Sequence, residues 1–367
     1  MCTTGPDGPG EGDGGMQPLR VGLIGAGRVS AAHLPAYRDY PERVTLAGIC
    51  DSAVPSAQKL AQSLGHERWW TDVDTFLREA DIDAVDILLP HHLHHPVALA
   101  ALRARKHVLV EKPLATSLAD CRELVAAATQ AGRTLMVAHM QRFQPGWRSL
   151  QAQLTSGRLG IVRHIRLDAI QNLHDYTEPP HWLYDGRRAG GGALISILIH
   201  RLDLLRYLAG EAKRAIAWGR SIDPAFHGAE DYAVGLLELE SGATVDLFTT
   251  YSAAALPYGE GLWLFTDQAV VHSVPGEGIY ERAVPRIAHR EATRSGRAFT
   301  DLEIEPTTLP TRDPFVNEIL HFADCVRDGT EPLSSGRDNL HTMAIVFALY
   351  ESMRRDGAAV DVASVLG

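Results

Sequence analysis

Two residues of this sequence have the side chains and the settings that proton exchange with an oxygen requires, Lys112 and His200. Lys112 follows the apolar run Val108–Val110 and stands between Glu111 and Pro113, and only four of the 35 basic residues are lysines. An ammonium group can lose or share a proton at accessible pH, whereas a guanidinium group cannot. Lysine at this position therefore indicates acid–base or oxyanion chemistry; the alternative is a solvated lysine at the end of a strand.

His200 lies in the segment 190–210, which begins with three glycines and continues as an apolar helical pattern that Gly210 ends. Ser196 lies four residues before His200 and Asp203 lies three residues after it, so the three side chains share one edge of that helix. An imidazole can move a proton near neutral pH, and a flanking carboxylate can orient it. The alternative is a hydrogen-bonded histidine of the core.

A dinucleotide-binding turn is indicated by Gly25 and Gly27, which follow a short apolar strand and open a helix. The first glycine permits a tight turn, and the second lets the backbone approach a pyrophosphate at the helix N-terminus. Asp51, at the end of the second strand, is placed to accept the ribose 2′-hydroxyl. No arginine follows Asp51 before Arg68, so a 2′-phosphate would meet negative charge, and we expect NAD rather than NADP.

Four histidines, His91, His92, His94 and His95, resemble a metal cluster at first sight. They come directly after a buried strand and Pro90, at the edge of a parallel sheet where a cofactor binds. No carboxylate or thiolate lies close by in sequence to complete a metal site. We therefore expect no metal, and instead a loop that lies against the nicotinamide or its ribose.

The order of the expected elements predicts an α/β fold with two domains, as the length of 367 residues also indicates. In the first part, strands are expected at 20–25, 44–50, 83–89, 107–110 and 134–138, with helices at 28–37, 53–64, 96–105 and 118–131. This alternation is typical of a doubly wound parallel sheet with right-handed crossovers. In the second part, strands are expected at 162–170, 212–220, 231–240 and 243–250, with few helices between them.

We assign residues 1–17 to a disordered leader and residues 18–142 to a dinucleotide-binding Rossmann domain. Residues 143–367 are predicted to form an α+β domain with a large, open, mostly antiparallel sheet that serves substrate binding and oligomerisation. The C-terminal helices of this second domain are free to pack back on the first. An open sheet would leave a large apolar face in water, so we expect a homodimer or a homotetramer.

Composition excludes several classes of partner. The formal net charge is −10 and no Lys/Arg-rich run stands out, so nucleic acid and membrane surfaces are not expected partners. The four cysteines are scattered without a CxxC pair, as in reduced cytoplasmic proteins. No apolar run reaches the roughly 18 residues that a membrane helix needs. We expect a cytoplasmic protein that acts on a small molecule.

Four segments together resemble the Gfo/Idh/MocA oxidoreductase family, named for glucose-fructose oxidoreductase and inositol dehydrogenase. They are VGLIGAGRVSAAHLPAY, ILLPHHLHHPVALAALRARKHVLVEKPLATS, MVAHMQRFQP and AGGGALISILIHRLDLLRYLAG, and the most specific part is KHVLxEKP. The resemblance spans nearly the whole chain after the leader. It implies a Rossmann domain, a C-terminal domain with a large open sheet, and NAD(P)-linked oxidation or reduction of sugars and cyclitols.

The resemblance also implies roles for residues at matching positions. Lys112 would contact the reacting oxygen and stabilise its developing charge, and His200 would exchange the proton with that oxygen. The residues expected at the cofactor are Gly25, Gly27, Arg28, Val29, Asp51, Leu89, Pro90, His91, His94, Glu111 and Lys112. The residues expected at the substrate are Arg142, His174, Tyr176, His181, Trp182, Tyr184, Ser196 and Asp203. In some members the equivalent of the Lys112–Pro113 bond is cis, and we consider the same here.

One position departs from the family pattern. Many members have an aspartate four residues before the histidine, where this chain has Ser196, and Leu198 replaces a frequent glycine. Without that carboxylate His200 lacks its usual partner, and this departure points to a specialised substrate. The candidates to replace it are Asp203, Tyr184 and Asp185.

We therefore predict an NAD-dependent enzyme, with NADP the less expected cofactor. It would transfer a hydride between nicotinamide and a secondary alcohol or ketone of a sugar, aminosugar or cyclitol. Two alternatives stay open. One is a redox-neutral NAD-dependent epimerase or glycosidase of the same family, and the other is a non-catalytic cofactor-binding sensor.

Overall fold

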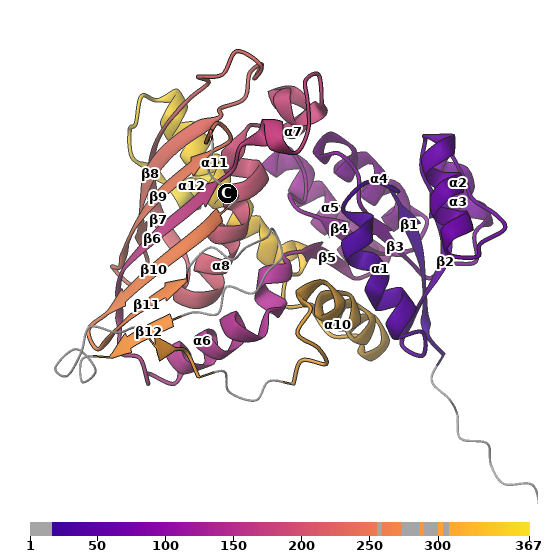
Figure 1. Cartoon of the computed structure of the whole chain (residues 1–367), viewed down its shortest axis with the longest axis horizontal. Helices are drawn as coiled ribbons and strands as arrows, with labels where there is room; N and C mark the ends of the chain where they lie inside the picture. Colours follow the sequence, from indigo (N-terminus) through magenta and orange to yellow (C-terminus); the bar gives the residue numbers. More distant parts are fainter. Residues whose placement is uncertain (1–16, 255–258, 274–285, 290–299, 304–307) are drawn as a thin grey trace, which may run out of the picture.

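The structure is a computed structural model that describes residues 17–254, 259–273, 286–289, 300–303 and 308–367. Two sheets organise the chain, one in each half of the sequence, and helices fill the space between them (Figure 1). Apart from Gln17, the predicted leader lies outside the described residues. No helix in these ranges has the length and apolar content needed to cross a membrane.

The first sheet has five parallel strands in the order β2-β1-β3-β4-β5. Its strands are β1 (Leu19–Ile24), β2 (Val44–Cys50), β3 (Ala84–Ile87), β4 (His107–Glu111) and β5 (Leu135–Ala138). The accompanying helices are α1 (Ser30–Asp39), α2 (Val54–Ser63), α3 (Val73–Glu79), α4 (His91–Arg103) and α5 (Leu118–Ala131). All residues of β3 and β5 are buried, as expected for strands covered on both faces. This arrangement confirms the predicted doubly wound parallel sheet.

The histidine segment forms helix rather than the expected loop. α4 begins at His91, five residues before the predicted start, and Pro96 lies inside the helix. The apolar pattern alone begins later, but His91 and His94 are also buried and are hydrogen-bonded to backbone carbonyls. These tertiary contacts hold the first turn of α4, which the local sequence pattern does not reveal.

The second sheet has nine strands in the order β13-β12-β11-β10-β6-β9-β8-β7-β14. The pairing of β6 with β9 is parallel and the others are antiparallel, which confirms the predicted open, mostly antiparallel sheet. Its strands are β6 (Val162–Ile170), β7 (Ala212–Arg220), β8 (Tyr232–Leu239), β9 (Thr244–Thr250), β10 (Gly259–Thr266), β11 (Ala269–Ser273), β12 (Arg286–His289), β13 (Thr300–Asp301) and β14 (Val360–Asp361).

The helical segments of this half lie between the two sheets or beside them. They are the 3₁₀ turns η1 (Met140–Phe143), η2 (Leu173–Asp175) and η3 (Trp182–Tyr184), the π-helical turn η4 (Leu194–Leu198), and the helices α6 (Pro145–Thr155), α7 (Gly186–Ala189), α8 (Ile199–Ala209), α10 (Pro314–Asp328), α11 (Gly336–Arg354) and α12 (Val362–Leu366). The predicted helix after the three glycines is therefore a π-helical turn that continues as α8, with Gly210 at its end.

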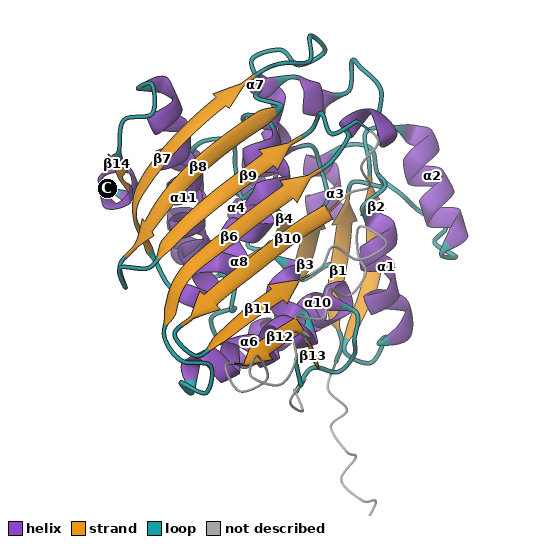
Figure 2. Cartoon of the chain, turned by 60° about the vertical axis from the view of Figure 1, so that its left-hand side comes forward, coloured by secondary structure: helices purple, strands orange, loops and turns teal. Residues whose placement is uncertain are grey.

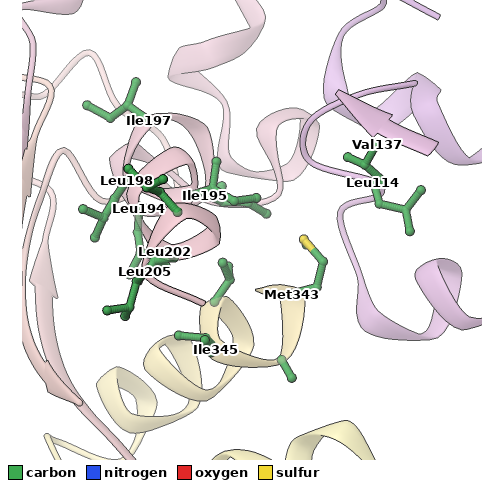
Figure 3. Close-up of a cluster of buried hydrophobic side chains, with 14 of the residues drawn as sticks. Leu114, Val137, Leu194, Ile195, Ile197, Leu198, Leu202, Leu205, Met343 and Ile345 are labelled. Atoms are coloured by element: carbon green, nitrogen blue, oxygen red, sulfur yellow. The ribbon is translucent and has the colours of Figure 1, made fainter. Parts of the chain in front are cut away.

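One face of the second sheet is covered and the other is open. On the covered face, Leu202 and Leu205 of α8 pack near Met343 and Ile345 of α11 (Figure 3). Burial of a large apolar side chain of this kind stabilises the fold by about 1.5–3 kcal/mol. Figure 2 looks onto the open face, where β7 and β8 present Trp218 (46% exposed) and Leu236 (49% exposed).

The C-terminal helices contact the first half of the chain. α10 packs against α1 and η1, and α11 packs against α5. Val316 and Ile319 of α10 share a core with Leu23 of β1 and Leu109 of β4. The second half of the sequence thus supplies one of the layers that cover the first sheet.

A buried ion pair fastens the junction of the two halves. Nε and Nη2 of Arg142 each donate to one carboxylate oxygen of Asp203 at 2.7 Å, and Nη1 donates to the Leu333 carbonyl at 2.8 Å. Arg142 Nη2 also lies 2.8 Å from an Asp338 oxygen. Both side chains make hydrogen bonds to groups of the protein itself, and their binding of substrate stays a prediction. Among the described residues, Asp203 bonds to Arg142 and Thr342 rather than to His200, so the prediction that Asp203 orients His200 is wrong.

We predict that Asp203→Ala lowers the free energy of unfolding by about 3 kcal/mol, because it removes the bidentate partner of a buried guanidinium and leaves it only the partly exposed Asp338 as counterion. Equilibrium urea denaturation measures the change. The control is Glu351→Ala, which removes the exposed partner of Arg354 and is expected to have little effect. Equal stability of the two variants would show that the buried pair does not hold the junction.

Candidate active site

The carboxyl ends of the parallel strands form the edge on which the candidate site is built. The Gly25–Gly27 turn follows β1, Asp51 follows β2, Leu89 follows β3 and Lys112 follows β4. In an open α/β sheet, ligands bind in the crevice at this edge. The sequence predicts that these residues meet at one edge because each follows a strand of a parallel sheet, and the strand order of the first sheet confirms that arrangement.

The glycine turn leaves room for an anion. Gly25 has φ of +106°, and a Cβ there would collide with the Leu88 carbonyl, so only glycine fits. A Cβ at Gly27 would meet nothing within 4 Å. In the described chain, the backbone N–H groups of Arg28 and Val29 have no carbonyl acceptor, and no side chain caps α1. Free N–H groups at a helix N-terminus fit the pyrophosphate of a dinucleotide.

Asp51 holds this turn from the second strand. Its Oδ2 accepts a hydrogen bond from Ala26 N at 2.7 Å, and its Oδ1 accepts one from Ala53 N at 2.8 Å. A carboxylate fixed at the end of β2 is placed to receive the adenosine ribose.

Segments of the second half reach over the same edge. Arg28 lies over the Tyr176 ring, 5.4 Å from its centroid, and Nη1 donates to the Tyr176 carbonyl at 3.5 Å. Nδ1 of His91 lies 2.8 Å from the Ala189 carbonyl, and the His91 and Trp182 rings meet edge to face at 4.6 Å. These contacts bring Tyr176 and Trp182 beside this edge of the first sheet, and their contact with substrate stays a prediction.

The other predicted substrate residues of this segment are placed differently. Tyr184 is buried and its hydroxyl donates to the Thr177 carbonyl at 2.8 Å, and its role at the substrate stays a prediction. His181 packs beside Trp182, and His174 Nε2 lies 2.7 Å from Asp223. Tyr184 holds the loop together through its own hydrogen bond, which a sequence pattern does not reveal.

Lys112 meets the helix that carries His200. Its Nζ donates to the Ser196 carbonyl at 2.6 Å, across the two halves of the chain. Burial lowers the pKa of Lys112, although the charges of Glu111 and Glu260 oppose that shift. Ser196 contributes its backbone carbonyl to this contact. The π-helical turn 194–198 is a local irregularity of the kind often found at functional sites.

His200 is held neutral. Burial lowers its pKa well below the usual range, and the nearby Lys112 ammonium lowers it further. Within the described residues, its buried Nδ1 has no hydrogen-bond partner. Asp185 and Tyr184 do not replace the missing aspartate as partners of His200. Asp185 caps α7 by accepting from Arg187 N, and the Tyr184 hydroxyl donates to the Thr177 carbonyl. A neutral imidazole can accept a proton from an alcohol.

Several polar residues near Lys112 were not predicted from the sequence. Glu260 of β10 accepts from Gln141, and Arg201 Nη2 donates to the Glu260 carbonyl at 2.6 Å. His139 lies close enough that its charge affects His200, and burial lowers the pKa of His139 to about 4. Two features of the sequence could have indicated these residues: a glutamate within an apolar strand and an arginine directly after His200.

Glu111 faces into the protein. Its Oε1 lies 3.3 Å from Nε2 of His33, and its Oε2 accepts a hydrogen bond from Lys112 N at 3.0 Å. Its two oxygens are thus engaged within the protein, and the binding of the cofactor by Glu111 stays a prediction. The sequence signals for this buried network were Asp86, an acid inside the apolar strand β3, and His33 on α1.

His94 ties two strand ends together. Its Nδ1 lies 2.7 Å from the Pro113 carbonyl and its Nε2 lies 2.7 Å from the Leu89 carbonyl. Both ring nitrogens are thus engaged with backbone, and any contact of His94 with the cofactor is through its carbon atoms. The Lys112–Pro113 peptide bond is cis, as in some family members. Pro90 precedes the first turn of α4 and lies at the same edge.

Among the described residues, ligand atoms with metal-site spacing occur at His95, Asp120 and Glu123. This group lies on α4 and α5, and His95 Nε2 is 3.0 Å from Glu123. It does not include Lys112 or His200 and takes no part in the candidate site.

Comparisons with known proteins agree with this architecture. Residues 19–139 match the model described as oxidoreductase family, NAD-binding Rossmann fold, and residues 147–271 match the GFO/IDH/MocA C-terminal domain. D-apiose dehydrogenase of Paraburkholderia graminis is 30% identical, over 95% of this chain and 91% of its own length. Myo-inositol 2-dehydrogenase of Thermotoga maritima is 24% identical, over 95% of this chain and its full length.

Solved structures show the same fold. Aldose-aldose oxidoreductase from Caulobacter crescentus, complexed with glycerol, superposes with a TM-score of 0.83 at 27% identity, covering 94% of this chain and 99% of that one. Levoglucosan dehydrogenase in complex with NADH gives a TM-score of 0.84 at 24% identity, with coverage of 94% and 99%. The chain therefore belongs to the Gfo/Idh/MocA oxidoreductase family, and its first half is an NAD-binding Rossmann fold.

Proposed function

We propose that this protein is an NAD-dependent oxidoreductase that acts on a secondary alcohol or ketone of a sugar, aminosugar or cyclitol. The observation that carries the proposal is the approach of Lys112 and His200, from different halves of the chain, beside an anion-binding glycine turn. The names of similar proteins, which include an apiose dehydrogenase and an inositol dehydrogenase, support the substrate class.

NAD, when bound, supplies or takes up the hydride. The N–H groups of Arg28 and Val29 would hold its pyrophosphate, and Asp51 would hold its ribose. In the oxidative direction, the neutral imidazole of His200 accepts the hydroxyl proton of the substrate. Lys112 donates a hydrogen bond to the same oxygen and stabilises the negative charge that develops there.

The environment of each group suits this division of roles. Burial lowers the pKa of Lys112, which brings its proton closer to exchange, yet Glu111 and Glu260 oppose the shift and favour the charged form. Lys112 in turn helps to keep His200 unprotonated. Two groups with opposite protonation states beside one oxygen provide an acid and a base at the same pH.

We expect Lys112→Met to reduce turnover by at least about 100-fold, the scale of a lost acid–base or oxyanion group, and to leave NAD affinity nearly unchanged. Nicotinamide absorbance against a panel of sugars and cyclitols measures turnover. Lys106→Met is the matched control, since Lys106 donates to the Ile82 carbonyl away from the site. Turnover within a few-fold of the parent would remove Lys112 from the mechanism.

We propose that NAD is preferred to NADP because Asp51 stands where a 2′-phosphate would lie. Asp51→Ser is expected to lower the ratio of NAD to NADP affinity by about 10-fold or more, since it removes a charged acceptor worth roughly 1.5–3 kcal/mol. Fluorescence titration with each cofactor gives the ratio, and Asp74→Ser is a surface control. An unchanged ratio would show that Asp51 does not select the cofactor.

A redox-neutral cycle with retained NAD is the second candidate. It is favoured by the contacts of Arg28 with Tyr176 and of His91 with Ala189, which bridge the cofactor edge from the second half. Conversion of substrate without net change in nicotinamide absorbance would establish this cycle in place of a dehydrogenase.

We also propose that the protein is located in the cytoplasm, as the sequence predicted.

We propose that the open face of the second sheet pairs two copies of the chain. Leu236→Glu places a charge on that face and is expected to lower the mass measured by sedimentation velocity to that of a monomer. Ile222→Glu is the control, because Ile222 is also exposed but lies beyond the end of β7. A parent protein that sediments as a monomer would refute the proposal.

A further inference from the structure

A chain of buried ionisable groups lies behind Lys112. His33 of α1 and Asp86 of β3 are both 0% exposed, and His33 Nδ1 lies 2.9 Å from Asp86 Oδ2. His33 Nε2 lies 3.3 Å from Glu111 Oε1, and the other Glu111 oxygen accepts the Lys112 backbone N–H. The hydrogen-bonded path from the centre of the first sheet thus runs to the backbone of Lys112, one residue beyond Glu111.

Both ring nitrogens of His33 face carboxylate oxygens. An imidazolium ring, which has two N–H donors, satisfies two such acceptors at once. Burial lowers the pKa of His33, but Asp86 and Glu111 outweigh burial and hold it well above the usual range. The Tyr37 hydroxyl donates to the same Asp86 oxygen at 2.8 Å. One cation thus balances two buried carboxylates.

The helix α10 closes this group from the other side. The Phe315 ring lies 5.6 Å from the His33 ring, and Glu318 is fully buried nearby. Burial raises the pKa of Glu318 well above the usual range, which makes it a neutral acid beside the charged chain. The charged neighbours of His33 are therefore Asp86 and Glu111, with Tyr37 and Glu318 as uncharged groups.

Glu111 transmits the effect of His33 to Lys112. Burial raises the pKa of Glu111, and the hydrogen bond and charge of His33 lower it, with a net shift below the usual value. Glu111 thereby stays ionised, and its negative charge favours the ammonium form of Lys112. Four histidines also lie near Lys112 and would oppose its positive charge if they were protonated: His91, His94, His139 and His200. The pKa of each is lowered, which favours the neutral ring.

We propose that His33, held between Asp86 and Glu111, is a positioning residue that fixes the ionised Glu111 carboxylate and so sets both the placement and the protonation of Lys112. The proposal rests on the proposed function only for the significance of Lys112 in turnover. It differs from a purely structural role, which would affect stability and leave the Lys112 amine unchanged.

The first test needs no variant. It uses ¹⁵N NMR spectra of the parent protein labelled at histidine, in which the His33 signals are assigned with the His33→Gln variant or by coupling to backbone resonances. We expect His33 to show two protonated ring nitrogens at neutral pH. A neutral His33 ring at that pH would overturn the proposal, because it could not bridge two ionised carboxylates.

The second test reads Lys112 directly. The chain has only four lysines, so reductive ¹³C-methylation yields few signals, and Lys112→Arg identifies that of Lys112. In His33→Gln, burial would protonate Glu111 and remove its charge, so the titration midpoint of Lys112 is expected to fall by about one pH unit or more. His321→Gln, at a half-buried histidine that accepts from Leu333 N, should leave the midpoint unchanged.

A double-mutant cycle tests the route. Glu111→Gln should lower the Lys112 midpoint at least as far as His33→Gln, and the double variant should fall no further than Glu111→Gln alone. Additive shifts, a rise, or an unchanged midpoint in His33→Gln would each overturn the proposal. These readouts need no substrate. If Lys112→Met kept its turnover, the proposed function would fail while the link from His33 to Lys112 could still be measured.

Discussion

The candidate site depends on keeping an ammonium charge where the two halves of the chain meet. Lys112 leaves β4 at the edge of the first sheet, and its Nζ reaches the Ser196 carbonyl on the turn that precedes α8. Burial there favours the neutral amine, and the charges of Glu111 and Glu260 work against burial. The acidic neighbours of Lys112 matter because the ammonium form stabilises a developing oxyanion more strongly than the neutral amine does.

The rest of the fold fixes the positions of the two segments that meet in this contact, the end of β4 and the turn before α8. On the side of His200, the Arg142–Asp203 pair fastens α8 to η1, and leucines of α8 pack on α11 (Figure 3). On the side of Lys112, His94 links the ends of β3 and β4 through two carbonyls. These contacts are formed within the protein, so the site is largely preorganised before substrate binds.

Sequence patterns were enough to predict both sheets, because parallel strands buried on both faces and alternating strands with one open face have distinct signatures. The positions of the glycine turn, Asp51 and Lys112 were predicted because each follows directly on a recognisable strand, and that of His200 because it lies within an apolar helical pattern. The expected start of α4 was wrong because burial of His91 and His94, rather than apolar periodicity, holds its first turn. Tertiary contacts of this kind leave no local pattern.

Four polar residues predicted at the site make their hydrogen bonds within the protein, which the sequence did not indicate. Arg142, Asp203, Tyr184 and Glu111 have side chains that could bind a ligand, but each is buried against another polar group of the chain. Their partners are far away in sequence, as Asp203 is from Arg142, so spacing could not reveal the pairing. The same limit hid His33 and Asp86, whose occurrence within apolar segments was the one available sign of a buried network.

The central claim is that an amine of the first half and an imidazole of the second act on one oxygen beside NAD. A crystal structure of the parent protein with NADH and a polyol that it turns over tests this most directly. We expect one substrate oxygen within roughly 2.6–3.2 Å of both Lys112 Nζ and a ring nitrogen of His200. A substrate that contacts only one of these two nitrogens, or neither, would contradict the account.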